Sequence, residues 1–367
     1  MSGTPSTAGG IDSLLPWLRA LTPEVRASLQ QPAARAQRLY GDWYAGFLGD
    51  GTQAAAVRSS AAMPGRPSLE PLLRAAALAT GVAESFWLAL QAGADGHCLA
   101  ARRDGLGMAR WLAGGEFVNL SRPGVPPAPG EALAVINRLQ WVDEETGYWV
   151  ARSPQAEPPH PLFRVYWSVS ADNAAALVHA LLPVLDGLKC SWSVKCPSQA
   201  EVFVRRDALV LYLPQAAWRR ARPRLLQAAM ACRSLLRDDC VPLAFPFATG
   251  VVWAESDSAE ESFGQARCRL LSAALAPWFG PPGASGAVAA RDVRAAVSAT
   301  FRSAGLDPQR PWRAARTPNA TGVVPTPAGG AAGDSASGVS LGAPTDATRA
   351  AVSPAPPAPR TAEVAPG

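Results

Sequence analysis

The sequence predicts an α+β fold made of an N-terminal helical region, a mixed core of strands and helices, and a disordered C-terminal tail. Apolar residues recur at i, i+3 and i+4 spacing over residues 1–95, as in amphipathic helices. Short alternating segments separated by Gly and Pro begin at His97. With 367 residues, of which 48% are hydrophobic, the chain is long enough for one large core or two modest ones.

The first region, residues 1–95, is expected to be mainly helical. Helical spacing covers the segments 12–20, 24–40 and 68–91. Trp43, Tyr44 and Phe47 lie close together in the sequence, and we expect them in the core. The alternative is a contact surface for a partner.

The second region, residues 96–306, is expected to be an α+β core. Strands are predicted at HCLAARR (97–103), GMARWLA (107–113), EFVNLSR (116–122), RVYWSVS (164–170), SWSVKC (191–196), AEVFVRR (200–206), ALVLYL (208–213) and GVVWAE (250–255). Helices are predicted from Ser170 through Leu188 and over 215–237, 262–276 and 292–304.

The third region, residues 307–367, is predicted to be a disordered tail. Its last part, 319–367, contains no aromatic residue and a single leucine, Leu341, among Ala, Gly, Pro, Ser and Thr. Such a composition cannot bury enough apolar surface to offset the entropy that ordering would cost.

Composition and charge exclude several classes of function. The net charge of +5 is spread along the chain without a basic stripe, so we expect no nucleic-acid binding. Six cysteines without a CxxC pair and only three histidines predict no metal site, and we expect no cofactor. Neither a membrane span nor a secretory signal is recognisable, so we expect a cytoplasmic protein without a membrane partner.

The use of lysine is unusual. Of 34 basic residues, 32 are Arg, and the two lysines are Lys189 and Lys195. A lysine can lose its proton near neutral pH, whereas a guanidinium group stays charged. Lys189 follows a predicted helix, where a cation is ordinary. Lys195 stands in the alternating segment SWSVKC and is the better candidate for a chemical role.

Candidate site residues gather in the same part of the chain. Strand alternation places Arg164 and Tyr166 on one face of a strand. Arg206 and Tyr212 share a face if their strand is continuous. With Lys195, Arg205 and Arg267, these residues would form a phosphate site that contains a base. The alternative is that the arginines are solvated surface cations and that Tyr212 is a core residue.

A third of the chain resembles a known family. The segments FRVYWSVS (163–170), SWSVKCPSQAEVFVRRDALVLYL (191–213), GVVWAES (250–256) and ESFGQARCRLL (261–271) are similar to the lyase-like family named after the HopA effector. More remotely, the chain resembles phosphothreonine lyases, which eliminate phosphate from a phosphorylated side chain without water.

The resemblance implies roles for individual residues. Lys195 would be the base that removes the α-proton. Arg164, Arg206 and Arg267 would hold the phosphate, and Tyr212 would orient the substrate. Where phosphothreonine lyases carry a general-acid histidine, this chain has Tyr166.

Three explanations for the absence of a histidine at this position remain open. Tyr166 supplies the hydrogen bond, or a histidine such as His97 or His160 folds in, or no acid is needed because arginine-bound phosphate is a competent leaving group. His179, within a predicted helix, is expected to be structural.

Through the resemblance, the sequence predicts a lyase that converts phosphoserine or phosphothreonine of a ribosomally made precursor peptide, as in lanthipeptide pathways, into dehydroalanine or dehydrobutyrine. The expected partners are the phosphorylated peptide, a kinase-like protein of the same pathway and a cyclase. Two alternatives stay open: a non-catalytic scaffold or substrate-binding partner of the kinase, and an effector that acts on phosphoproteins.

Overall fold

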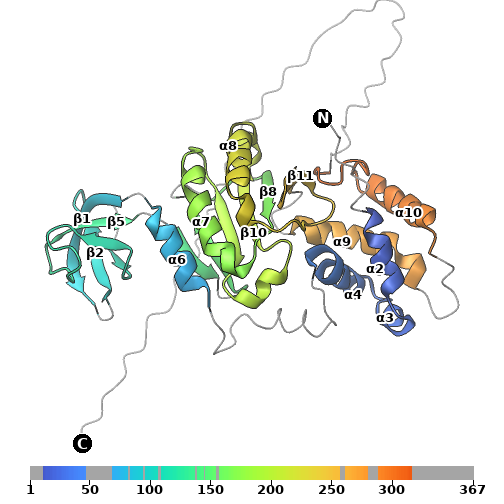
Figure 1. The fold of residues 1–367 in the computed structure, drawn as a ribbon, viewed down its shortest axis with the longest axis horizontal. Helices are drawn as coiled ribbons and strands as arrows, with labels where there is room; N and C mark the ends of the chain where they lie inside the picture. The colour runs from blue at the N-terminus through green and yellow to red at the C-terminus, as the bar shows by residue number, and fades with distance from the viewer. Residues whose placement is uncertain are drawn as a thin grey trace, which may run out of the picture. The chain divides into compact units, whose positions relative to one another are not determined.

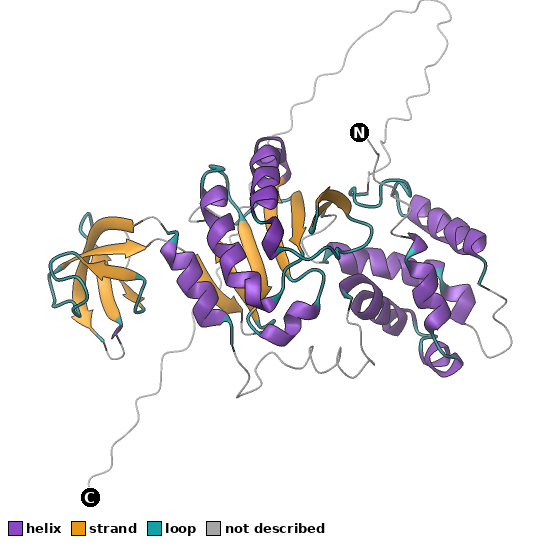
Figure 2. Cartoon of the chain, in the orientation of Figure 1, coloured by secondary structure: helices purple, strands orange, loops and turns teal. Residues whose placement is uncertain are grey.

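The computed structural model describes residues 11–46, 68–81, 83–93, 96–105, 109–136, 139–143, 145–153, 157–256, 261–279 and 288–315. The chain divides into two compact units, Met1–Asn319 and Ala320–Gly367, and every described residue belongs to the first. Within the described residues the fold combines helices with antiparallel sheets, so the predicted α+β class is confirmed (Figure 1, Figure 2).

The N-terminal region begins with short helices. Their bounds are Leu14–Ala20 (α2), Pro23–Ser28 (α3), Pro32–Arg38 (α4) and Leu39–Ala45 (the π-helical turn η1). Thr22 caps α3 because its hydroxyl accepts a hydrogen bond from the Val25 amide, and Pro32 stands at the first position of α4. The predicted helix 24–40 is therefore divided. Trp43 and Tyr44 are buried, whereas Phe47 lies outside the described residues.

The predicted helix 68–91 is wrong in its second half. Helix α6 (Glu70–Ala79) ends before Gly81, and the chain then forms strand β1 (Ala83–Ala92). Trp87 and Ala89 of this strand are buried while Phe86 is exposed, which is the two-residue period of a strand. The apolar run FWLAL fits both periods, and its aromatic content favours the strand.

Strand β1 belongs to a small antiparallel sheet. Among the described residues its strands run in the order β3–β2–β1–β5–β4. The other bounds are Cys98–Arg102 (β2), Arg110–Leu112 (β3), Phe117–Asn119 (β4) and Ala132–Ile136 (β5). The first three confirm the strands predicted at 97–103, 107–113 and 116–122.

A larger antiparallel sheet has the order β11–β12–β8–β10–β9–β7–β6 within the described ranges. Its strands are Leu139–Asp143 (β6), Tyr148–Arg152 (β7), Leu162–Trp167 (β8), Ser193–Pro197 (β9), Leu209–Pro214 (β10), Phe245–Ala248 (β11) and Val251–Glu255 (β12). The helices of this part are Ala171–Asp186 (α7), Trp218–Ala231 (α8), Phe263–Ala274 (α9) and Ala290–Ser303 (α10), with the short 3₁₀ turns Ala200–Val204 (η3), Gln215–Ala217 (η4), Arg233–Leu235 (η5) and Ala276–Phe279 (η6).

The two faces of the larger sheet differ. Helices α7 and α8 cover one face (Figure 1), where Val165, Trp167 and Leu211 are completely buried. Strand alternation sends Arg164 and Tyr166 to the opposite face. The sheet therefore has one apolar face that packs on helices and a second face that carries polar side chains.

Residues 307–315 of the predicted tail pack on this core. Trp312 is 7% exposed, and its carbonyl accepts a hydrogen bond from the Glu255 amide. Arg313 forms an ion pair with Glu255. This part of the chain contains the last tryptophan of the sequence, which supplies the apolar surface that the later tail lacks. The rest of the predicted tail lies outside the described residues.

Two features are absent from the described residues. No helix there is long and apolar enough to cross a membrane. No group of three or more His, Cys, Asp or Glu side chains in the same residues could hold a metal ion. All six cysteines are free thiols.

Candidate functional site

The polar face of the larger sheet forms the floor of a cavity of about 1000 Å³. Helix α4 and the turn η1 contribute one part of its wall, and α9 contributes another. The strands supply Arg164, Tyr166 and Lys195 to the floor.

Strand register explains why these side chains meet. Tyr212 of β10 lies opposite Arg164 of β8, and Val210 lies opposite Tyr166. On its other side, Val210 lies opposite Lys195 of β9. Residues directly opposite each other in antiparallel strands point to the same face. The same face of the sheet therefore carries Lys195, which was predicted to be the base, together with Tyr166 and the Arg164–Tyr212 pair.

Aromatic rings hold the cations of the floor. The Lys195 amine lies 5.2 Å from the ring centroid of Tyr148 and 5.6 Å from that of Tyr212. The Arg164 guanidinium carbon lies 5.3 Å from the same Tyr212 ring. Ring faces attract cations without neutralising them. Within the described part of the chain, neither Lys195 nor Arg164 forms a salt bridge with a carboxylate.

Arg164 is fixed but incompletely hydrogen-bonded. It is 6% exposed, and its Nη2 donates to the Ser256 hydroxyl (3.0 Å) and to the Glu261 carbonyl (3.3 Å). Its buried Nε has no hydrogen-bond partner among the described residues. A buried guanidinium N–H without an acceptor favours an anionic ligand at this position.

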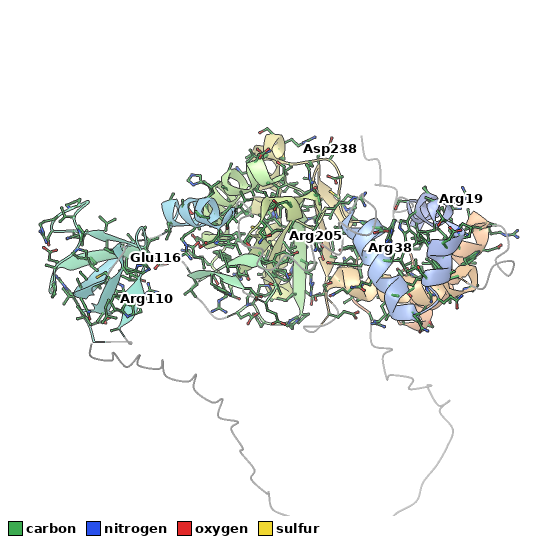
Figure 3. All side chains as sticks on the ribbon, turned by 90° about the horizontal axis from the view of Figure 1, so that it is seen from below. Arg19, Arg38, Arg110, Glu116, Arg205 and Asp238 are labelled. Atoms are coloured by element: carbon green, nitrogen blue, oxygen red, sulfur yellow. The ribbon has the colours of Figure 1, made fainter. Side chains whose placement is uncertain are left out.

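A second cation of the cavity, Arg205, is paired. Its Nε and Nη2 donate to the two carboxylate oxygens of Asp207 at 2.7 and 2.8 Å. The Tyr40 hydroxyl donates to Asp207 (3.0 Å) and accepts from Arg205 (2.8 Å). Burial alone would raise the pKa of the Asp207 carboxyl, but Arg205 and Tyr40 hold that pKa below its usual value. Figure 3 shows the Arg205 side chain among those of the larger sheet.

The charges that line the cavity leave a cationic surplus. Asp207 is matched by Arg205, and Glu261 is matched by Arg269 at 3.1 Å. Arg164 and Lys195 are the remaining lining cations among the described residues. The lining thus carries a net charge of +2, which equals in magnitude the charge of a phosphate monoester dianion. Outside the lining, hydrogen bonds from Thr146 and Glu145 and the charge of Lys195 lower the pKa of the Asp143 carboxyl.

All five tyrosines of the chain line this one cavity: Tyr40, Tyr44, Tyr148, Tyr166 and Tyr212. Burial raises the pKa of Tyr166 to about 12, against the opposing effect of Arg164. Burial likewise raises the pKa of Tyr148 to about 12. Both phenols therefore remain protonated hydrogen-bond donors at neutral pH.

Two predicted phosphate ligands lie outside the cavity lining. Arg206 donates from Nη1 to the Trp43 carbonyl (2.8 Å) and packs against Gly46. Buried Arg267 donates to the carbonyls of Pro311 (2.8 Å) and Arg313 (2.7 Å). Arg267 thus holds residues 307–315 on α9. Its placement gives it a structural role, and it does not support phosphate binding.

The placement of Arg206 has a local cause. The predicted strand 200–206 is the 3₁₀ turn η3 followed by a bend, and β10 begins only at Leu209. Even spacing from Tyr212 therefore does not put Arg206 on the floor. Its neighbour Arg205 takes the position at the cavity.

The histidines stay away from the floor. His97, His160 and His179 all belong to the described residues, all are exposed, and none lines the cavity. The structure thus removes the option that His97 or His160 folds into this site. Tyr166 is left as the phenol on the floor next to Arg164.

Sequence reasoning missed several lining residues. Tyr40 and Tyr44 reach the cavity from η1, and Tyr40 bonds Asp207 from 167 residues away. Tyr148 comes from β7. The sequence offered one signal for them. The chain has only five tyrosines, and this small number suggests considering all of them as candidate site residues.

A cavity with a lysine, an unpaired guanidinium and neutral phenols is suited to binding a phosphorylated group and to moving a proton. The model of the HopA1 effector protein family matches residues 143–313, from the end of β6 to the segment held by Arg267. The match confirms the resemblance predicted from the sequence for this part of the chain. No curated protein matches the chain.

Two solved structures of effector proteins from Pseudomonas syringae are similar to the chain. The protein of pathovar syringae strain 61 has 20% identity and a TM-score of 0.36, and the alignment covers 46% of this chain and 64% of that one. This chain thus spans less than two thirds of that protein's length. The protein of pathovar tomato strain DC3000 has 13% identity and a TM-score of 0.44, with 83% and 97% covered.

Proposed function

We propose that this protein is a lyase that eliminates phosphate from phosphoserine or phosphothreonine of a ribosomally made precursor peptide. The observation that carries the proposal is the pair of cations Arg164 and Lys195, which form no salt bridge with the carboxylates of the cavity lining, on a floor lined by phenols. A phosphate monoester matches their charge, and the free Nε of Arg164 offers it a hydrogen bond. The match to the HopA1 effector family supports the same class.

The chemistry is a β-elimination. Lys195 binds the phosphate as a cation and then gives its proton to solvent. Its uncharged amine takes the α-proton of the phosphorylated residue. The electron pair of that C–H bond becomes the Cα=Cβ double bond, and the Cβ–O bond breaks so that phosphate departs with its electrons. Arg164 stabilises the charge on the departing phosphate, and the products are dehydroalanine or dehydrobutyrine.

Tyr166 is the hydrogen-bond donor in this scheme. Its hydroxyl stays protonated because burial raises its pKa to about 12. A neutral phenol next to Arg164 donates to a phosphate oxygen throughout the neutral range. No histidine is needed for this step.

The expected partners remain part of the proposal. A kinase-like protein would phosphorylate the peptide and a cyclase would consume the dehydroamino acid. Neither needs to be present for a phosphorylated synthetic peptide to react.

The test is mass spectrometry of phosphoserine and phosphothreonine peptides incubated with wild type, Lys195→Arg and Lys189→Arg. Lys195→Arg keeps the positive charge of the floor but removes a group that can give up its proton. Lys189, the other lysine of the chain, is exposed and outside the cavity lining, so its variant is the matched control. We expect wild type and Lys189→Arg to remove the mass of one phosphoric acid, and Lys195→Arg to remove none.

Three other outcomes have defined meanings. Equal elimination by Lys195→Arg contradicts the base role. Binding of phosphopeptide without elimination, also with the kinase partner present, favours a scaffold. Elimination from folded phosphoproteins and not from peptides favours an effector.

A further inference from the structure

The cavity is larger than one phosphorylated side chain requires. Its volume of about 1000 Å³ is at the upper end of the range of roughly 300–1,000 Å³ that holds a whole drug-sized ligand. Arg164 and Lys195 occupy the floor only. The remaining space is bounded by helices, whose chemistry differs from that of the floor.

Apart from Arg269, the residues that α4 and α9 contribute to the cavity lining are uncharged. The apolar members of this helical wall are Pro32, Ala33 and Ala36 from α4 and Leu270 and Ala273 from α9, and its polar uncharged members are Gln37, Gln265 and Ser272. Helices α4 and α9 pack against each other, so these residues form one surface (Figure 1). The charged residues near it, Glu261 and Arg269, neutralise each other.

Half of this wall comes from outside the family match. Residues 32–38 precede the matched range 143–313, whereas Lys195 and Arg164 lie inside it. The floor and the α4 wall thus come from separate parts of the sequence. The hydrogen bonds of Tyr40 with Asp207 and Arg205 connect them. A wall supplied separately from the floor can set specificity without taking part in the chemistry.

We infer that the α4–α9 wall binds the residues that flank the phosphorylated one, and that it selects peptides with small or aliphatic residues at those positions. The inference rests on the proposed function of the floor. Once phosphate has neutralised Arg164 and Lys195, a flanking residue meets no unpaired charge on the wall. Aliphatic side chains gain by burial there, at about 25 cal/mol per Å² of apolar surface, whereas a charged side chain would lose water without a partner.

The probes are three synthetic phosphoserine peptides that differ only in the residues on both sides of phosphoserine, namely Leu, Glu or Lys. Dissociation constants are measured on the full-length Lys195→Arg protein, which keeps the charge of the floor, and turnover is measured separately on proteins with Lys195 intact. We expect the Leu-flanked peptide to bind at least about tenfold more tightly than the other two, a difference of about 1.4 kcal/mol.

Variants of α4 make the test specific. Ala33→Glu places a carboxylate on the wall, and Ala34→Glu places the same group on the next residue of the helix, which is exposed and does not line the cavity. Ala33→Glu should weaken binding of the Leu-flanked peptide and strengthen binding of the Lys-flanked one. Ala34→Glu should change neither by more than about twofold, as is usual for a surface substitution.

The outcomes separate the two proposals. Equal affinity for all three peptides, no binding of any of them, or equal effects of Ala33→Glu and Ala34→Glu would overturn the wall's role. Selective binding without turnover by wild type would leave the wall's role standing and contradict the lyase.

Discussion

Arg164 and Tyr212 lie directly opposite each other on β8 and β10, and the guanidinium carbon of Arg164 is 5.3 Å from the centroid of the Tyr212 ring. The centroid of the same ring is 5.6 Å from the amine of Lys195, which belongs to β9, the neighbour of β10 on the side away from β8. One phenol ring therefore lies within cation–π distance of both Arg164 and Lys195. A carboxylate in its place would hold them more strongly, but it would also compete with an anionic ligand.

Replacement of Arg164 should weaken phosphate binding. Arg164→Gln removes the charge, and Arg164→Lys keeps the charge without the planar fork. A charge-assisted hydrogen bond is worth about 1.5–3 kcal/mol, so we expect the affinity for a phosphoserine peptide to fall roughly 10- to 100-fold in Arg164→Gln and less in Arg164→Lys. Isothermal titration calorimetry measures both. An Arg164→Gln protein that is folded and binds like wild type would rule out this phosphate position.

Asp207→Asn should destabilise the protein. The substitution leaves the Arg205 charge without its carboxylate in a largely buried position, where breaking an ion pair costs about 3–5 kcal/mol. Urea denaturation measures the loss. The double variant Arg205→Met with Asp207→Asn removes both charges and should recover part of it. A double variant less stable than Asp207→Asn would show that the pair is not the cause.

The Arg205–Asp207 pair also predicts that the protein loses stability at acid pH. The pKa of Asp207 is lower in the folded chain than its usual value of 3.8, so the folded state binds this proton less readily than the unfolded state. The contribution of ionised Asp207 to the free energy of unfolding is complete above the pKa that this carboxyl has in the unfolded chain. It is lost as the pH falls through the pKa that it has in the folded chain. We expect the free energy of unfolding to decrease as the pH falls below about 5, and the part due to Asp207 to be missing in Asp207→Asn.

The tyrosines predict the behaviour at alkaline pH. Burial raises the pKa values of Tyr148 and Tyr166 to about 12 and those of Tyr40 and Tyr44 well above 10. Tyrosines of the unfolded chain ionise near pH 10. Between about pH 10 and about pH 12 the folded chain should therefore hold protons that the unfolded chain has lost, and its stability should fall across this window. Ultraviolet absorbance of tyrosinate, with and without guanidinium, measures the difference. Identical titration in both states would contradict the buried cavity.

Gly264→Ala should disturb the tyrosines. A Cβ at Gly264 would meet the Tyr44 ring at 2.3 Å and the Tyr40 ring at 2.8 Å. Overpacking of this kind costs about 1–3 kcal/mol. Gly114→Ala is the control, because its nearest neighbour is the Gly96 carbonyl at 3.8 Å. We expect a lower melting temperature and weaker phosphopeptide binding for Gly264→Ala only, and equal melting temperatures would count against the contact.

The floor of the site could be predicted because strands have a simple period. Arg164 and Tyr166 are two residues apart on a continuous strand, and no bulge intervenes. Lys195 was prominent because lysine is rare in this chain. The same rule failed for Arg206, since η3 and the bend after it break the alternation before β10 begins.

The wall could not be predicted because it depends on long-range contacts. Nothing local to Tyr40 shows that its hydroxyl bonds Asp207. Likewise, the sequence near Arg267 does not reveal that Pro311 and Arg313 supply its acceptors. The prediction of a helix over 68–91 was wrong in its second half for a different reason, because the apolar run there fits both the helical and the strand period.

The gathering of all five tyrosines around one cavity makes the protein a convenient spectroscopic subject. Isotope labelling of tyrosine alone would give nuclear magnetic resonance signals from the site and from no other part of the chain. Tyr40 and Tyr44 would report on the wall, and Tyr166 and Tyr212 on the floor. A titration with phosphopeptide could thus follow the two halves of the site separately, without assignment of the rest of the spectrum.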